Sequence, residues 1–133
     1  MNKKRSFLTV LGAAALVGAS VQPAAAVEDD DLRFDTTDDL YAVCTVAASA
    51  PEYPVANQAC RAFIEATVQY HDAVSDRKQL KRLVCYPKSA TIQDGKDAFL
   101  AWAKKNASDR KLMKETPVVG LVRALAEKYP CKG

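Results

Sequence analysis

Four cysteines restrict the possible folds of this chain more than any other feature of its 133-residue sequence. Cys44, Cys60, Cys85 and Cys131 have 15, 24 and 45 residues between them. A structural zinc site uses closely spaced ligand pairs, and the chain has a single histidine, His71, so we expect no metal site. An even number of cysteines in a small exported domain is typical of disulfides. The sequence therefore predicts two disulfide bonds, provided that the chain is exported.

Residues 1–26 have the pattern of a secretory signal peptide. A basic start, Lys3–Arg5, precedes an apolar run that ends at the small residues Ala24–Ala26. The run is short and rich in alanine, which disfavours a membrane span; retention as an anchor is the alternative. We expect cleavage at the end of this segment and a periplasmic mature protein with no membrane segment. The mature chain would have an acidic flexible leader over residues 27–35 and a helical domain over residues 36–133.

Removal of the signal peptide leaves a nearly neutral protein. The whole chain has 19 basic and 16 acidic residues, and three of the basic ones lie in residues 1–26, so 16 of each remain. A neutral balance gives no reason to expect a nucleic acid partner or a membrane surface. The charges are unevenly placed, since residues 27–60 hold eight acids and one base while residues 61–133 hold eight acids and fifteen bases. This polarity could steer a charged partner, but solvated helix faces explain it equally well.

Helix-start signals occur at three places in the mature chain. Two have the threonine and aspartate spacing of a capping box, and the third is a threonine followed by a proline, which suits the first helical position. The pairs are Thr36 with Asp39, Thr91 with Asp94, and Thr116 with Pro117. Another helix is predicted over residues 56–74, where the longest helical pattern lies, and we expect the first helix to end before residues 49–51.

Apolar residues at helical spacing predict which faces are buried. For the long helix the expected core stripe is Ala59, Phe63, Ala66, Tyr70 and Ala73 or Val74. For the next helix it is Ile92, Gly95, Ala98, Phe99 and Trp102, and for the last it is Val118, Leu121, Val122, Leu125 and Tyr129. Gly95 costs about 1 kcal/mol relative to alanine inside a helix, so we expect it to mark a close helix crossing. His71 falls off the stripe and is expected to be a partly exposed structural residue.

These elements predict an all-α fold, a compact domain of four to five helices cross-linked by two disulfides. If the first two helices are antiparallel, Cys44 near the end of one lies beside Cys60 near the start of the next. By the same argument the end of the last helix brings Cys131 to Cys85. With all four cysteines paired, a small hydrolase would need a base near a serine or threonine; His71 is the one candidate, and the sequence shows no positioned partner for it. We therefore expect neither an enzyme nor a cofactor.

Four sequence segments together resemble the Tai family of type VI secretion amidase immunity proteins. They are DDLYAVC at residues 38–44, CRAFIEA at 60–66, VCYP at 84–87 and ALAEKYPC at 124–131. The chain departs from the family where Ala66 replaces a usual glycine and where residues 106–108 replace a frequent proline. The resemblance implies a periplasmic helical protein, commonly a homodimer, that blocks a papain-like peptidoglycan amidase. A protruding loop or helix end would enter the enzyme groove and cover its cysteine and histidine.

The segment that we expect to contact the amidase is the polar, basic stretch of residues 104–115. It is expected to be a loop, with Lys104, Arg110, Lys111 and Met113 as partner contacts. A merely solvated connection is the alternative for any one of these residues. A different function is also open, because small exported helical proteins include acid-stress chaperones. In that case acidification would make the acidic leader and the nearly neutral mature chain strongly positive, which would release a dimer and expose the apolar stripes.

Overall fold

The computed structural model describes residues 33–77 and 80–132, and within them the fold is all-α, as the sequence predicts. The helices are α1 (Thr37–Cys44), α2 (Tyr53–Ser75), α3 (Ile92–Asn106), α4 (Arg110–Met113) and α5 (Pro117–Lys128). The expected signal peptide and residues 27–32 of the expected leader lie outside the described residues. None of the helices in the described ranges combines the length and the apolar character of a membrane span.

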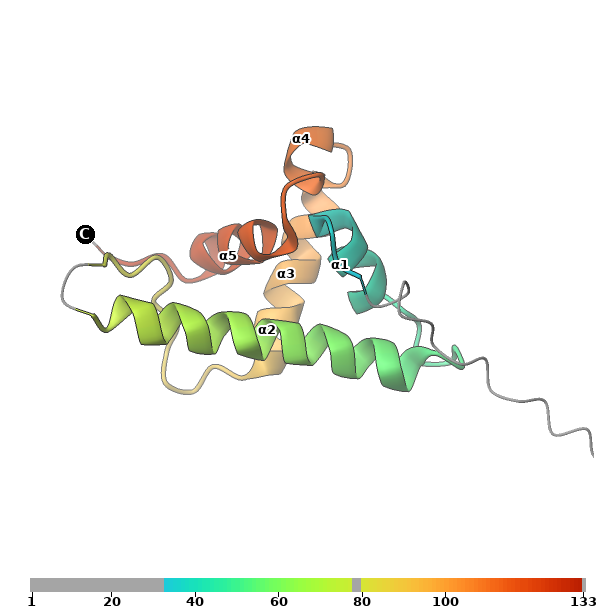
Figure 1. Cartoon of the computed structure of the whole chain (residues 1–133), viewed down its shortest axis with the longest axis horizontal. Helices are drawn as coiled ribbons and strands as arrows, with labels where there is room; N and C mark the ends of the chain where they lie inside the picture. Colours follow the sequence, from blue (N-terminus) through green and yellow to red (C-terminus); the bar gives the residue numbers. More distant parts are fainter. Residues whose placement is uncertain (1–32, 78–79, 133) are drawn as a thin grey trace, which may run out of the picture.

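Helix α3 is the central element, because it packs against each of the other helices. In Figure 1, α2 runs along the longest axis of the molecule, α1 and α5 lie on one side of it, and α3 passes behind them. The short helix α4 lies at the end farthest from α2. The core where these elements meet includes Leu40, Ile64, Phe99 and Leu121, whose side chains are fully buried.

Both predicted capping boxes are present. The hydroxyl of Thr36 accepts a hydrogen bond from the backbone N–H of Asp39, whose carboxylate accepts one from the N–H of Thr36 at 2.8 Å. Thr91 and Asp94 make the same reciprocal pair at the start of α3. Thr116 also occupies the cap position, but its side chain makes no capping bond, and Pro117 opens the helix as expected.

The tightest helix crossing lies between Thr37 and Gly120 rather than at Gly95. The Thr37 side chain is fully buried, and its hydroxyl donates to the carbonyl oxygen of Glu115 at 3.0 Å. A Cβ added to Gly120 would lie 2.9 Å from the Cβ of Thr37 and closer still to the ends of that side chain. At Gly95 the nearest neighbour of an added Cβ would be Cγ2 of Ile64 at 3.3 Å. Gly95 is therefore a close crossing, as predicted, and Gly120 is a closer one because a side chain points directly at it.

Both predicted disulfides are confirmed. Cys44–Cys60 joins the end of α1 to α2, with its Cα atoms 5.2 Å apart. Cys85–Cys131 joins the segment before α3 to the residues after α5, with its Cα atoms 4.9 Å apart. Each bond thus joins the two segments that the sequence expectation paired.

The predicted core face of α2 is wrong. The residues that this helix buries are Ala56, Cys60, Ile64 and His71, while Tyr70 is 70% exposed. Each residue turns a helix by about 100°, so a shift of one position moves the buried stripe to an adjacent face. The disulfide fixes Cys60 against α1 and thereby selects the stripe that contains Ile64. Helix α1 also ends earlier than expected, at Cys44.

The predicted face of α5 is correct in part. Leu121 and Leu125 are buried, but Val118 is 42% exposed, because the small residues Gly120 and Ala124 allow the helix to approach closely on a different edge. The exposed side forms an open apolar groove with Leu83, which is 56% exposed. The residues that line this groove are Leu83, Val118, Val119, Val122, Arg123 and Ala126.

Candidate functional site

The segment expected to be a partner-binding loop is largely helical. Helix α3 continues through Asn106, and α4 follows after a short turn. The carboxylate of Asp109 caps α4 by accepting from the backbone N–H groups of Lys111 at 3.0 Å and Leu112 at 3.1 Å. The Asn106 side chain donates to the carbonyl oxygen of Trp102 at 2.8 Å. These three hydrogen bonds hold the turn in one conformation, so its surface is preformed.

The preformed end of the molecule carries unpaired positive charge. Lys104, Arg110, Lys111 and Lys114 are exposed, and none of them forms an ion pair in the described residues. Asp109, the acid between Lys104 and Lys114, is occupied as a helix cap. We call Lys104, Arg110, Lys111 and Lys114 the cationic end. Such a cluster attracts an acidic partner surface without first having to release a bound carboxylate.

Neighbouring basic residues differ from the cationic end because they are neutralised. Lys105 Nζ lies 2.9 Å from Glu127 Oε1, and Arg123 makes two hydrogen bonds of 2.8 Å to the Glu115 carboxylate. Lys105 and Arg123 therefore add no unpaired charge beside the cationic end.

Met113 does not lie on this surface. Its side chain is 2% exposed and belongs to the hydrophobic core, where it fixes α4 to the rest of the fold. The structure thus brings Lys104, Arg110 and Lys111 together on one end of the molecule and separates Met113 from them. Met113 was expected to be a contact in a loop, whereas it lies on a single helical turn that has a buried side.

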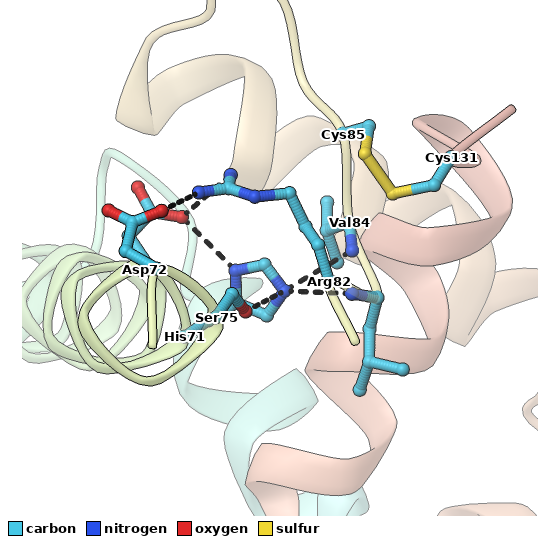
Figure 2. The surroundings of a disulfide bond; sticks show 9 residues. His71, Asp72, Ser75, Arg82, Val84, Cys85 and Cys131 are labelled. Atoms are coloured by element: carbon cyan, nitrogen blue, oxygen red, sulfur yellow. Dashed lines mark hydrogen bonds and ion pairs between the residues drawn. A yellow bond between two sulfur atoms is a disulfide. The ribbon is translucent and has the colours of Figure 1, made fainter. Parts of the chain in front are cut away.

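A second cluster surrounds His71, which is 8% exposed rather than partly exposed as predicted. Its Nε2 atom accepts hydrogen bonds from the backbone N–H groups of Leu83 and Val84, both at 3.2 Å. Its Nδ1 atom lies 3.1 Å from Oδ1 of Asp72, as Figure 2 shows. Since Nε2 must accept, the proton of the neutral ring belongs on Nδ1 and is donated to Asp72.

Asp72 connects the histidine to the next segment of the chain. Its carboxylate accepts from Arg82 Nη1 at 3.2 Å and from the Tyr86 hydroxyl, while Arg82 also reaches Asp76 at 2.9 Å. Burial is the largest single influence on the pKa of Asp72 and would raise it, but the hydrogen bonds from Tyr86 and His71 and the charge of Arg82 together hold it below its usual value. Burial, followed by the hydrogen bond to Asp72, raises the pKa of Tyr86. The cluster therefore favours an ionised Asp72.

The cluster contains the residue types of a catalytic triad, which the sequence analysis did not foresee. Ser75 Oγ lies 3.4 Å from His71 Nε2, and Asp72 is on the other side of the ring. In a hydrolase that nitrogen must be free to take the proton of the serine. Here its lone pair faces two backbone N–H donors, so His71 cannot serve as the base for Ser75. His71 therefore has a structural role, because its hydrogen bonds hold residues 83–84 against α2.

Replacing Asp72 by asparagine is expected to lower the free energy of unfolding by about 1 kcal/mol near neutral pH, a value kept small because the carboxylate is 34% exposed. A depressed pKa contributes stability that is present above the usual value of 3.8 and is lost as the pH falls through the folded-state pKa. The difference between the two proteins should therefore vanish well below pH 3.8. Urea unfolding across this pH range measures it. Asp76→Asn, which alters a more exposed partner of Arg82, is the matched control and should show a smaller difference at every pH.

The described residues contain no group of three or more histidine, cysteine, aspartate or glutamate side chains that could hold a metal ion. The candidate sites described above are the cationic end and the polar cluster around His71. The long-range contacts to residues 83–84 could not be read from the sequence, because the pattern around His71 shows only that Asp72 and Ser75 are near it along the helix.

Comparison with known proteins identifies the family. The family model of the Rap1a immunity proteins matches residues 36–131, which covers every helix described above. No curated protein and no solved structure matches the chain. The match includes both disulfides and the cationic end. The chain therefore belongs to the Rap1a immunity proteins, a type VI secretion immunity family.

Proposed function

We propose that this protein is a periplasmic immunity protein that binds and occludes a papain-like peptidoglycan amidase delivered by type VI secretion. Family membership supports immunity against a secreted effector. The resemblance of four sequence segments to the Tai family supports an amidase as that effector. The signal peptide expected at residues 1–26 supports action in the periplasm, where such an amidase would cut the cell wall.

The observation that carries the binding mode is the unpaired charge at the cationic end. Lys104 lies in the last turn of α3, and Arg110 and Lys111 lie on α4, which is at the end of the molecule farthest from α2 (Figure 1). Oriented cations at an interface speed the encounter with an acidic partner and fix its orientation. Occlusion needs no chemistry from the inhibitor, because covering the catalytic groove excludes the substrate. The enzyme-like cluster at His71 is accordingly not part of the mechanism.

The experiment is a pull-down from periplasmic extract with the oxidised protein, followed by an assay of the captured amidase. A stoichiometric cysteine amidase that loses activity when the protein is added is the expected result. Capture of no amidase would contradict the proposed effector class while leaving the family assignment intact. Size-exclusion chromatography of the same sample would show whether the protein binds as the proposed homodimer.

Charge reversal tests the cationic end directly. The triple variant Lys104→Glu, Arg110→Glu and Lys111→Glu is expected to weaken binding to the amidase about 100-fold, chiefly through slower association at low salt. The matched control is Lys81→Glu, Lys88→Glu and Lys132→Glu, which makes the same change in net charge at other exposed positions. Surface plasmon resonance at two salt concentrations measures both. Equal losses for the two triple variants would show that net charge, and not this surface, determines binding.

A further inference from the structure

The two disulfides differ in their access to solvent. Cys44 is 3% exposed and Cys60 is fully buried, so the bond between them lies inside the core. Cys85 is exposed and Cys131 is half-buried, and their bond lies at the surface beside the last described residues. Figure 2 shows this second bond next to the segment that holds Val84. Thiol–disulfide exchange begins with attack of a thiolate on a sulfur atom, so it depends on that access.

The segment that carries Cys85 is also held without the disulfide. The backbone N–H of Cys85 donates to the carbonyl oxygen of Tyr129 at 2.9 Å, and Val84 forms an isolated antiparallel bridge with Pro130. The Val84 side chain is 2% exposed, and its N–H donates to His71. These contacts keep the two strands of backbone side by side when the sulfur atoms separate. Opening this bond is therefore a local event.

We propose that Cys85–Cys131 is a thiol–disulfide exchange site for a dithiol reductant of the thioredoxin-fold class, while Cys44–Cys60 is a permanent cross-link. One thiolate of the reductant attacks Sγ of Cys85, the more exposed partner. A mixed disulfide forms as the Cys85–Cys131 bond breaks, and the electron pair leaves on Cys131, which takes up a proton. The second thiolate of the reductant then attacks the sulfur of the reductant's first cysteine in the mixed disulfide. Cys85 leaves as a thiolate and is protonated, and the reductant carries away the new disulfide.

This exchange would change the surface next to the bond. Leu83, which lines the apolar groove on α5, lies two residues before Cys85. In the oxidised protein the cross-link restricts the path of this segment relative to the end of α5. In the reduced protein only hydrogen bonds and the burial of Val84 restrict it. The bond follows the C-terminal end of α5, whereas the cationic end precedes the N-terminal end of this helix (Figure 1), so the inference does not depend on the proposed effector surface.

Partial reduction of the native protein tests the proposal. The oxidised protein is treated with dithiothreitol for increasing times, thiols are trapped with iodoacetamide, and peptide mass spectrometry locates the alkylated cysteines. Cys85 and Cys131 are expected to be alkylated at least about tenfold faster than Cys44 and Cys60, because the buried pair reacts only after the core opens. Simultaneous alkylation of all four cysteines, or earlier alkylation of the buried pair, would overturn the proposal.

A variant that lacks the exposed bond provides a second test. Cys85→Ala with Cys131→Ala is expected to keep the helical circular dichroism spectrum of the oxidised protein, and its remaining disulfide should resist dithiothreitol as it does in the native chain. Loss of the helical spectrum would show that the bond cannot open locally. A thioredoxin-fold dithiol protein in place of dithiothreitol should give the same order of alkylation. Reversal of that order would show that this class of reductant does not act at Cys85–Cys131.

Discussion

Gly120→Ala is expected to reduce the free energy of unfolding by about 3 kcal/mol, the upper end of what overpacking usually costs. The added methyl group would overlap the Thr37 side chain, which is fully buried and cannot turn away. The Thr37 hydroxyl and N–H both bind the Glu115 carbonyl oxygen, so relief of the overlap requires α1 to move away from α5 and lose those bonds. Urea unfolding followed by circular dichroism measures the loss.

Gly95→Ala is the control for this prediction. It removes a glycine from a helix and gains about 1 kcal/mol in helix propensity. The added Cβ would lie 3.3 Å from Cγ2 of Ile64, a tight contact that offsets part of that gain. We expect a change close to zero. A similar loss at both glycines would mean that chain flexibility, and not the contact with Thr37, explains the effect at Gly120.

His71→Ala is expected to destabilise the protein by about 3 kcal/mol, because it leaves two backbone donors without a partner and opens a space in the core. The donors are the N–H groups of Leu83 and Val84, and the second is buried. Thermal unfolding measures the stability, and hydrogen exchange at these two amides reports the local contact. Both amides should exchange faster in the variant.

Ser75→Ala is the matched control, because it removes the hydroxyl group that also lies near Nε2 of His71. The distance between Ser75 Oγ and this nitrogen is 3.4 Å, which is long for a hydrogen bond of this type. We expect a change within about 0.5 kcal/mol. If Ser75→Ala cost as much as His71→Ala, the serine would be an essential part of the cluster and the assigned role of the histidine would be wrong.

Local sequence signals predicted the parts of the fold that depend on few residues. The capping boxes at Thr36 and Thr91 need only a partner three positions away, and both are present. The disulfide pairing followed from the order of the helices and a single antiparallel assumption. The buried face of α2 could not be predicted in this way, because the helix has apolar residues on two adjacent faces. The position of Cys60 decides between them, and only the folded structure shows which face it selects.

The candidate sites were predictable to a smaller extent. The charges of Lys104, Arg110 and Lys111 are visible in the sequence, but whether carboxylates neutralise them depends on the packing of distant residues. Glu115 and Glu127 pair with other cations, and these three have no ion pair within residues 33–77 and 80–132. Met113 was misplaced because one turn of helix gives too little periodicity to reveal a buried side. The contact of His71 with residues 83–84 joins segments that have no shared pattern.

The hydrogen bonds between Thr37 and Glu115 join residues separated by 78 positions in the chain. Cys85 and its disulfide partner Cys131 are likewise separated by 46 positions. Contacts over such separations form late in folding, because long loops must close first. A chain that emerges from its first residue onward therefore has no partner for the buried Thr37 until residues 115–120 are available. The domain can therefore complete its core only after nearly the whole of residues 36–131 has been synthesised.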